Sequence, residues 1–258
     1  MKKILFVVLL ALFSCTFAFA KIQFVYVKGG LFEMGSSMST QDEGPVHEVT
    51  LSSFFISKTE ITQSQWEKVM GYNNSYFLGE DRPVENVSWY EAIEFCNIKS
   101  ENEGLEPAYY INSKMTKMNL EANGYRLPTE AEWEYVAGGG AQATPTVFAG
   151  SNIRNNVSNT KAEATYPVAT KQPNELGLYD MTGNVAEWTW DWYDLSTYEL
   201  RVLSQRNKNP TGMPFGDYKV IRGGSWESTK QVSFISFRSY QYPNKRVNNV
   251  GFRIVRRK

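Results

Sequence analysis

The sequence predicts a single α+β domain with little regular secondary structure. Three observations support this fold class. Three amphipathic segments begin with helix start signals, short alternating segments typical of strands occur near both ends, and a long central stretch shows neither pattern. Because the 258-residue chain contains no repeat and no clear linker, we expect one large domain rather than two small ones.

Short strands are expected first, between Lys21 and Lys58. The segment FVYVKGGLFEMGS alternates between apolar and polar residues around a turn at Gly29 and Gly30. The segment HEVTLSSFFISK then alternates again. Alternation of this kind, bounded by turn residues, indicates short strands.

Three helices follow, and each begins with the same signal. A Ser or Thr stands three residues before a Glu or Gln, which is the spacing of a capping box. The two side chains then satisfy backbone N–H groups that have no partner within the helix. The pairs are Thr62 with Gln65, Ser88 with Glu91, and Thr129 with Glu132. Glycines after these segments, among them Gly71 and Gly138, predict where the helices end.

Regular structure is harder to predict after Gly140. The stretch up to Asp180 is rich in Asn, Thr, Pro and Gly, which indicates a packed loop. So long a loop is uncommon in a compact domain and should be functional or fixed by contacts other than a sheet ladder. The segment VAEWTWDWY then predicts a strand with Trp188, Trp190 and Trp192 on one face. Two more strands are predicted in YKVIRGGSW and NVGFRIVRR.

The composition excludes one class of partner. Lys and Arg together number 27 and so do Asp and Glu, so no basic field indicates nucleic-acid binding. The 7 Trp, 15 Tyr and 15 Phe stand beside 19 Gly and 10 Pro. This combination indicates a loop-rich fold held together by large aromatic side chains.

Residues 1–20 have the features of a secretory signal peptide. Two lysines precede an apolar run, and AFA at positions 18–20 matches an A-x-A cleavage site. Cleavage after Ala20 leaves a domain of residues 21–258, exported to the periplasm or the extracellular space. A second interpretation stays open, because LFSC loosely resembles a lipoprotein processing site. Lipidation at Cys15 would make the protein an envelope-anchored lipoprotein in contact with a membrane.

Few side chains suggest reactive chemistry by themselves. Cys96 is the one cysteine left after cleavage, so no internal disulfide can form, and its helical setting favours a small buried side chain. The single histidine, His47, stands at a strand start and is expected to be structural. Arg126 is expected to form an ion pair with a helix carboxylate. Three further arginines are candidates for fixing loops through bidentate contacts: Arg222, Arg238 and Arg253.

Eight motifs in a fixed order carry a family resemblance. They are GGLFEMGS, PVHEVTLSSFFISKTEIT, QWEKVMG, RPVENVSWYEAIEFCN, NGYRLPTEAEWEYVAGGG, PNELGLYDMTGNVAEWTWDWY, KVIRGGSW and NNVGFRIV. Together, from about Val27 to Val255, they resemble the formylglycine-generating enzyme family, whose domain is also called the sulfatase-modifying factor domain. The resemblance implies a variant of the C-type lectin-like fold with unusually little secondary structure.

The resemblance also shows which groups this chain lacks. Oxidising members of the family convert a substrate cysteine to formylglycine with two cysteines that bind copper, and soft thiolates select Cu(I). Counted from the RGGS motif, the matching positions here are Ser228 and Ser233. Because a neutral serine hydroxyl is a poor Cu(I) ligand, copper is not expected as a cofactor. Another branch of the family uses iron bound by three histidines, whereas this chain has only His47.

The loop YDMTGNVAEW resembles a structural calcium site of the family. The resemblance implies an ion held by carboxylate and backbone carbonyl oxygens, and Ca²⁺ takes about six to eight such ligands from a flexible loop. The implied ligands are Asp180, Gly183, Val185 and Glu187, with Asn156 and Val157 as a second set. The alternative is that the two carboxylates simply accept backbone N–H groups at a tight turn. The loop also has Ala where the family usually carries Trp.

Two functions follow from these observations. The first is an exported binding module without cysteine oxidase activity, which binds an unknown protein, peptide or glycan through a C-terminal cleft. The cleft residues implied by the resemblance are Arg222, Ser225, Trp226, Ser228 and Ser233. The second is an enzyme of the formylglycine-generating family, either a protein-modifying oxidoreductase or one of divergent activity. A hydrolase is not expected, because a Ser nucleophile needs a general base and the one histidine is distant in sequence.

Overall fold

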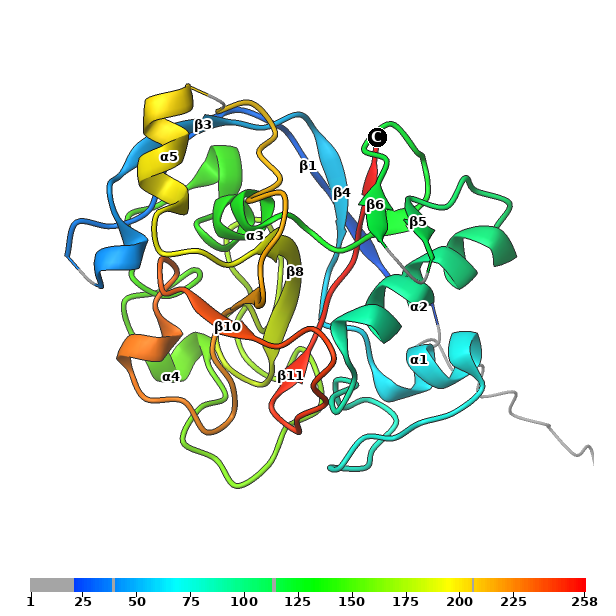
Figure 1. Ribbon diagram of the computed structural model, residues 1–258. Helices are drawn as coiled ribbons and strands as arrows, with labels where there is room; N and C mark the ends of the chain where they lie inside the picture. The colour runs from blue at the N-terminus through cyan, green and yellow to red at the C-terminus, as the bar shows by residue number, and fades with distance from the viewer. Residues whose placement is uncertain (1–20, 39, 113–114, 206) are drawn as a thin grey trace, which may run out of the picture.

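The computed structural model describes residues 21–258, apart from positions 39, 113–114 and 206. The predicted signal peptide of residues 1–20, with Cys15, lies outside the described residues. In the part of the chain that is described, no helix has the length and apolar character needed to cross a membrane. Figure 1 shows α1 and α2 on one side of the molecule and α5 on the other, with strands between them.

Short strands, gathered in two four-stranded sheets and two separate pairs, form the centre of the described chain. The strands are β1 (Phe24–Val27), β2 (Leu31–Met34), β3 (His47–Thr50), β4 (Phe54–Ser57), β5 (Tyr109–Ile111), β6 (Thr116–Met118), β7 (Tyr125–Arg126), β8 (Ala186–Trp192), β9 (Lys219–Arg222), β10 (Ser239–Gln241), β11 (Val250–Gly251) and β12 (Val255–Arg257). The first sheet, in the order β1-β4-β12-β7, is antiparallel throughout. The second, in the order β10-β9-β8-β11, has one parallel pair, β8 with β11.

The two predicted strands around Gly29 form, but they do not pair with each other. Strand β1 pairs with β4, and β2 pairs with β3. At the turn between β1 and β2 the backbone lies against a neighbouring segment, so that a Cβ on Gly29 would lie 2.2 Å from the Leu51 carbonyl oxygen. Only glycine permits so close an approach of two backbones.

All three predicted helices form, and each has its predicted capping box. They are α1 (Gln63–Met70), α2 (Trp89–Asn102) and α3 (Glu130–Ala137). Gly71 ends α1 in the left-handed region, with φ of 77°. Gly138 follows α3 with a helical φ of −75°, and Gly139 is the residue that turns left-handed, with φ of 93°. Gly71 and Gly138 therefore mark the ends of α1 and α3 as expected, whereas the residue that caps α2 is Glu103.

Two further helices were not predicted. They are α4 (Arg154–Val157), inside the long loop, and α5 (Thr197–Ser204). Single 3₁₀ turns occur at Gln41–Glu43, Gly140–Gln142 and Gln231–Ser233. The remaining chain after Gly140 is mostly irregular, so the mixed α and β fold with little regular secondary structure is confirmed.

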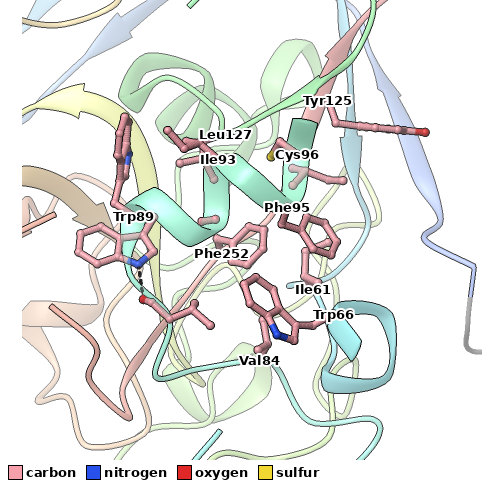
Figure 2. Close-up of a cluster of buried hydrophobic side chains, with 14 of the residues drawn as sticks. Ile61, Trp66, Val84, Trp89, Ile93, Phe95, Cys96, Tyr125, Leu127 and Phe252 are labelled. Carbon is pink, nitrogen blue, oxygen red and sulfur yellow. Dashed lines mark hydrogen bonds between the residues drawn. The ribbon is translucent and has the colours of Figure 1, made fainter. Parts of the chain in front are cut away.

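One apolar core joins α1 and α2 to the end of the chain (Figure 2). Trp66 of α1 stacks on Phe95 of α2 with ring centroids 5.5 Å apart, and Phe252 meets both rings edge-on. All three side chains are fully buried. Truncating such a core aromatic to Ala costs about 3–5 kcal/mol. This cluster therefore contributes strongly to the position of both helices.

The tryptophan-rich strand β8 is buried on both of its faces. Trp188 is fully buried, while Trp190 and Trp192 are half-buried. The residues between them are polar and also buried: Glu187, Thr189 and Asp191. Alternation in this strand therefore separates aromatic from polar side chains, and both kinds face the interior.

Candidate functional site

The RGGSW segment turns sharply at the end of β9. Gly223 and Gly224 follow Arg222 with φ of 92° and 68°, angles that glycine adopts without strain. A Cβ on Gly224 would also lie 2.8 Å from the Val232 carbonyl oxygen. The two glycines therefore let the chain fold back closely on the segment that follows.

The guanidinium of Arg222 is fully buried and holds that following segment in place. It donates to the carbonyl oxygens of residues 235–237 at 2.7–3.0 Å. It also pairs with the carboxylate of Glu134 on α3. Burial raises the pKa of Glu134, while Arg222 and the N–H of Gly35 favour its charged form. Arg222 thus anchors the backbone of residues 235–237 to α3.

The two serines at the oxidase positions take part in local turns. The Oγ of Ser228 accepts the N–H of Ser225 at 2.8 Å, and the Ser233 hydroxyl donates to the carbonyl oxygen of Thr229 at 2.9 Å. Ser228 is 9% exposed and Ser233 only 1%. Among the described residues, the hydroxyls of Ser225, Ser228 and Ser233 form no hydrogen bond to a histidine or a carboxylate. No base is in place to activate any of them as a nucleophile.

Trp226 is half-buried and ties the turn to neighbouring segments. Its indole N–H donates to the carbonyl oxygen of Asn248 at 3.1 Å, and its ring meets Phe77 edge-on at 5.3 Å. Its backbone N–H donates to the carbonyl oxygen of Asn184 at 2.7 Å. The residues predicted to line a cleft are therefore mostly buried, and their side chains hold neighbouring segments in place. A surface accessible to a ligand lies next to these residues.

That surface is a hollow of about 680 Å³, which we call the apolar hollow. Its larger apolar side chains are Phe32, Met38, Tyr135, Val147, Phe234 and Ile235. Glu134 reaches its base, and the wall formed by residues 234–236 includes two of the three residues whose carbonyls Arg222 holds. In the described part of the chain, no side chain of the predicted cleft lines this hollow. Arg222 instead stabilises the hollow indirectly, because it holds the backbone of its wall.

Segments far apart in the sequence build the apolar hollow. The ring of Phe234 lies 5.5 Å from that of Phe148, and the N–H of Ile235 donates to the Val147 carbonyl oxygen at 3.0 Å. Met38, which is 95% exposed, comes from the loop after β2. The sequence gave no sign of Met38 or Val147. Both are single apolar residues in polar segments, so no local pattern marks them.

The loop predicted to bind calcium contains a buried ion pair. Glu187 accepts hydrogen bonds from Arg253 at 2.6 and 2.7 Å and from the Trp133 indole N–H at 2.7 Å. Both carboxylate oxygens thus have hydrogen-bond partners within the protein, and the ligand role of Glu187 stays a prediction. Asp180 accepts the N–H of Ala169 at 2.7 Å, as the alternative of a turn-capping carboxylate requires. Calcium binding itself stays a prediction.

A carboxylate that the sequence did not single out holds the backbone of the same loop. Glu60 accepts the Asn184 side-chain amide at 2.7 Å and the N–H of Val185 at 3.0 Å. The N–H of Gly183 donates to the Gly223 carbonyl oxygen at 2.9 Å, which joins this loop to the RGGSW turn. Burial, together with neighbouring carboxylates, raises the pKa of Glu60 well above its usual value. Among the described residues, no group of three or more His, Cys, Asp or Glu side chains is arranged to hold a metal ion.

The second candidate calcium set lies at the end of α4. Val157 is buried, whereas the side chain of Asn156 is exposed. The carbonyl oxygen of Asn156 accepts the N–H of Gln172 at 2.9 Å. This oxygen has a partner within the protein, and the second site also stays a prediction.

Three other residues lie where the sequence placed them. Cys96 is fully buried, and burial raises the pKa of its thiol well above the usual value. His47 lies 2.8 Å from the Pro45 carbonyl oxygen through Nδ1, and burial lowers its pKa. Arg126 forms a bidentate ion pair with Glu132 at 2.6 and 2.7 Å.

All three arginines that were candidates for fixing loops do so. Arg222 holds residues 235–237, and Arg253 pairs with the carboxylate of strand β8. Arg238 binds both oxygens of Glu130 at 2.7 and 3.0 Å. Each of these guanidinium groups is fully buried. A fold with so little regular structure is therefore fixed in part by buried arginine–carboxylate pairs.

One family model covers almost the whole chain. The model for the sulfatase-modifying factor enzyme 1-like domain matches residues 16–258. The chain belongs to the sulfatase-modifying factor family. Its fold is that expected for the family. That Ser228 and Ser233 replace the two cysteines of the oxidases stays a prediction.

The proteins to which this chain is similar carry different functional names. The chain is 37% identical to the chaperone protein LppX of Paenibacillus barcinonensis over 91% of this chain and 89% of that protein. Its structure resembles that of the Treponema denticola variable protein 1 with a TM-score of 0.83 and 31% identity, over 92% of this chain and 95% of that one. It is also 33% identical to the serine/threonine-protein kinase pkn1 of Chlamydia pneumoniae over 91% of this chain, but spans only 38% of that kinase.

Proposed function

We propose that this protein is an exported binding module of the sulfatase-modifying factor family, which binds apolar segments of a protein partner in the apolar hollow and does not oxidise cysteine. The observation that carries the proposal is the part played by Arg222. The arginine of the family's RGGS motif is used to fix the wall of an open apolar surface. The positions of the two thiolates hold serines that bond their own loop.

The chemistry of the hollow favours a protein ligand over a small metabolite. Its lining is mainly apolar, and exposed Met38 and Val147 stand at its edge. Flexible methionine side chains with aromatic neighbours suit surfaces that bind varied apolar segments. The relative LppX is named a chaperone protein, a description that fits capture of exposed apolar chain.

A binding measurement with a permanently unfolded protein tests this function. The probe is reduced, carboxymethylated α-lactalbumin labelled with a fluorophore, and the readout is fluorescence anisotropy against the purified protein without its signal peptide. We expect saturable binding, weakened at least tenfold in a Met38→Ser, Val147→Ser double variant, because tenfold corresponds to about 1.4 kcal/mol of lost apolar contact.

The matched control is Leu203→Ser, which removes an apolar side chain that is 73% exposed on α5 and does not line the hollow. We expect this variant to bind like the wild type. Equal binding by the double variant would contradict the role of the hollow. A wild-type protein that does not bind the probe would contradict recognition of apolar segments altogether.

The second candidate function is a protein-modifying oxidase, favoured by family membership alone. We expect no aldehyde when the protein is incubated with copper and a sulfatase peptide that contains the substrate cysteine. Robust conversion, detected by mass spectrometry, would replace the binding module with an enzyme.

Mass spectrometry of the mature N-terminus separates the two routes of export, since it distinguishes a free Lys21 from an acylated Cys15.

A further inference from the structure

A second hollow lies at the other end of β9, away from the RGGSW turn. It has a volume of about 280 Å³, and we call it the lysine pocket. Its lining residues are Trp89, Tyr90, Asn112, Met115, Thr116, Trp190, Trp192 and Lys219. Trp192 and Lys219 are directly paired across strands β8 and β9, and Trp89 is the first residue of α2. Regular elements therefore hold the aromatic walls in place.

The amine of Lys219 is enclosed by three indole rings. Its Nζ lies 3.7 Å from the ring centroid of Trp192, 4.0 Å from that of Trp89 and 4.6 Å from that of Trp190. The residue is 1% exposed, so its charge is held within the protein. Indole faces attract a cation, and this arrangement fixes the amine at one place in the pocket.

The hydrogen-bonding capacity of this amine is only partly used. Nζ donates to the Trp190 carbonyl oxygen at 2.7 Å, and an ammonium group has three N–H donors. Among the described residues, no carboxylate forms a salt bridge with Lys219. Burial lowers the pKa of Lys219 well below its usual value, and nearby Asp191 opposes this shift. The lysine therefore lacks the close anionic partner that buried cations normally have.

The other lining residues limit which ligand could supply that partner. Among the described residues, the pocket lining contains no acidic side chain, and Lys219 is the one charged group in it. Flat faces of Trp and Tyr suit the apolar face of a ring, and the Thr116 hydroxyl offers a hydrogen bond to a hydroxyl group of a ligand. The volume suits one ring rather than a chain of them.

We propose that the lysine pocket binds a single acidic sugar unit, a hexuronic acid, with its ring against the tryptophans and its carboxylate on Lys219. A neutral sugar would make the same stacking contacts but would leave the lysine without a counter-charge. An acidic peptide side chain would meet the charge but would not fill the aromatic walls. This site is separate from the apolar hollow, so it goes beyond the protein-binding function proposed above.

The test uses methyl β-D-glucuronide and methyl β-D-glucoside, which differ only in the carboxylate, with binding followed by tryptophan fluorescence and isothermal titration calorimetry. We expect the glucuronide to bind at least tenfold more tightly than the glucoside. In Lys219→Met this preference should fall to about one, because the charge is gone while the aromatic walls remain. The control Tyr240→Ser changes an exposed tyrosine of β10 that does not line the pocket, and should leave both affinities unchanged.

A second variant keeps the proposal testable if Lys219→Met does not fold. Thr116→Trp fills the pocket from its half-buried edge without changing the lysine, and should abolish binding of both sugars. Absence of saturable glucuronide binding to the wild type would overturn the proposal. Equal affinity for the two sugars, or unchanged preference in a folded Lys219→Met variant, would overturn the role of the charge. These measurements use no protein ligand, so their failure leaves the proposal for the apolar hollow untouched.

Discussion

The two ends of strand β9 place a buried cation in two different settings. At one end Arg222 donates to a carboxylate and three backbone carbonyl oxygens, and the apolar hollow lies beside the segment that it holds. At the other end Lys219 has one carbonyl acceptor and three aromatic faces, and it lines a pocket itself. A cation that donates to several acceptors within the protein serves as an anchor for loops. A cation left with spare donors is available to a ligand.

Replacement of Arg222 should have the largest effect of the changes that test this comparison. Arg222→Met leaves Glu134 buried without its partner and frees the carbonyls of residues 235–237. Breaking a buried pair in this way costs about 3–5 kcal/mol of the free energy of unfolding, measured by urea denaturation. The control Arg246→Met breaks an ion pair with Glu91 whose arginine side chain is 51% exposed, and should cost less than about 1 kcal/mol. Similar losses in both variants would refute the anchoring role.

Lys219→Met should act in the opposite direction. The pKa of Lys219 is lower in the folded protein than in the unfolded chain, where it is about 10.4. Between these two values the unfolded chain binds more protons than the folded protein. The free energy of unfolding of the wild type therefore rises with pH in this window. Removing the amine removes that dependence. At neutral pH the variant should gain stability from this source, less the contacts to the indoles that are lost with the amine. Paired urea titrations from neutral to alkaline pH should show the stability difference shrinking as pH rises. A difference that does not change with pH would contradict the unpaired-cation account.

Calcium should produce the smallest effect. Because Arg253 and Trp133 already occupy both oxygens of Glu187, we expect added calcium or chelator to leave the melting temperature unchanged. Differential scanning fluorimetry measures this, since a ligand that binds only the folded state raises the melting temperature. A calcium-dependent rise that Asp180→Ala abolishes would restore the calcium site and show that the ion pair can rearrange.

Local signals explain why some elements were predictable from the sequence. The three capping boxes are complete within a few residues each, so the starts of α1, α2 and α3 could be placed before any tertiary contact was known. The amphipathic α5 was missed although Ser196 and Glu199 have the spacing of a capping box, and in the structure the Ser196 side chain makes no capping hydrogen bond.

The site was less predictable because its geometry depends on contacts between distant residues. The motif resemblance marked Arg222 and the two serines, but not that all three side chains turn inward. The sequence also did not show that Arg253, from the last part of the chain, lies against Glu187. The apolar hollow combines Met38, Val147 and Phe234, and only the folded structure brings these segments together.

Hydrogen exchange measured with and without bound probe tests the central claim most directly. The protein is saturated with reduced, carboxymethylated α-lactalbumin, and its backbone amides are followed by mass spectrometry. The account predicts slower exchange in residues 143–147 and 234–236, which border the apolar hollow, and no change in Trp190–Trp192 of the lysine pocket. Protection at the lysine pocket instead, or bound probe with no protection around the hollow, would contradict the claim that Arg222 supports a protein-binding surface.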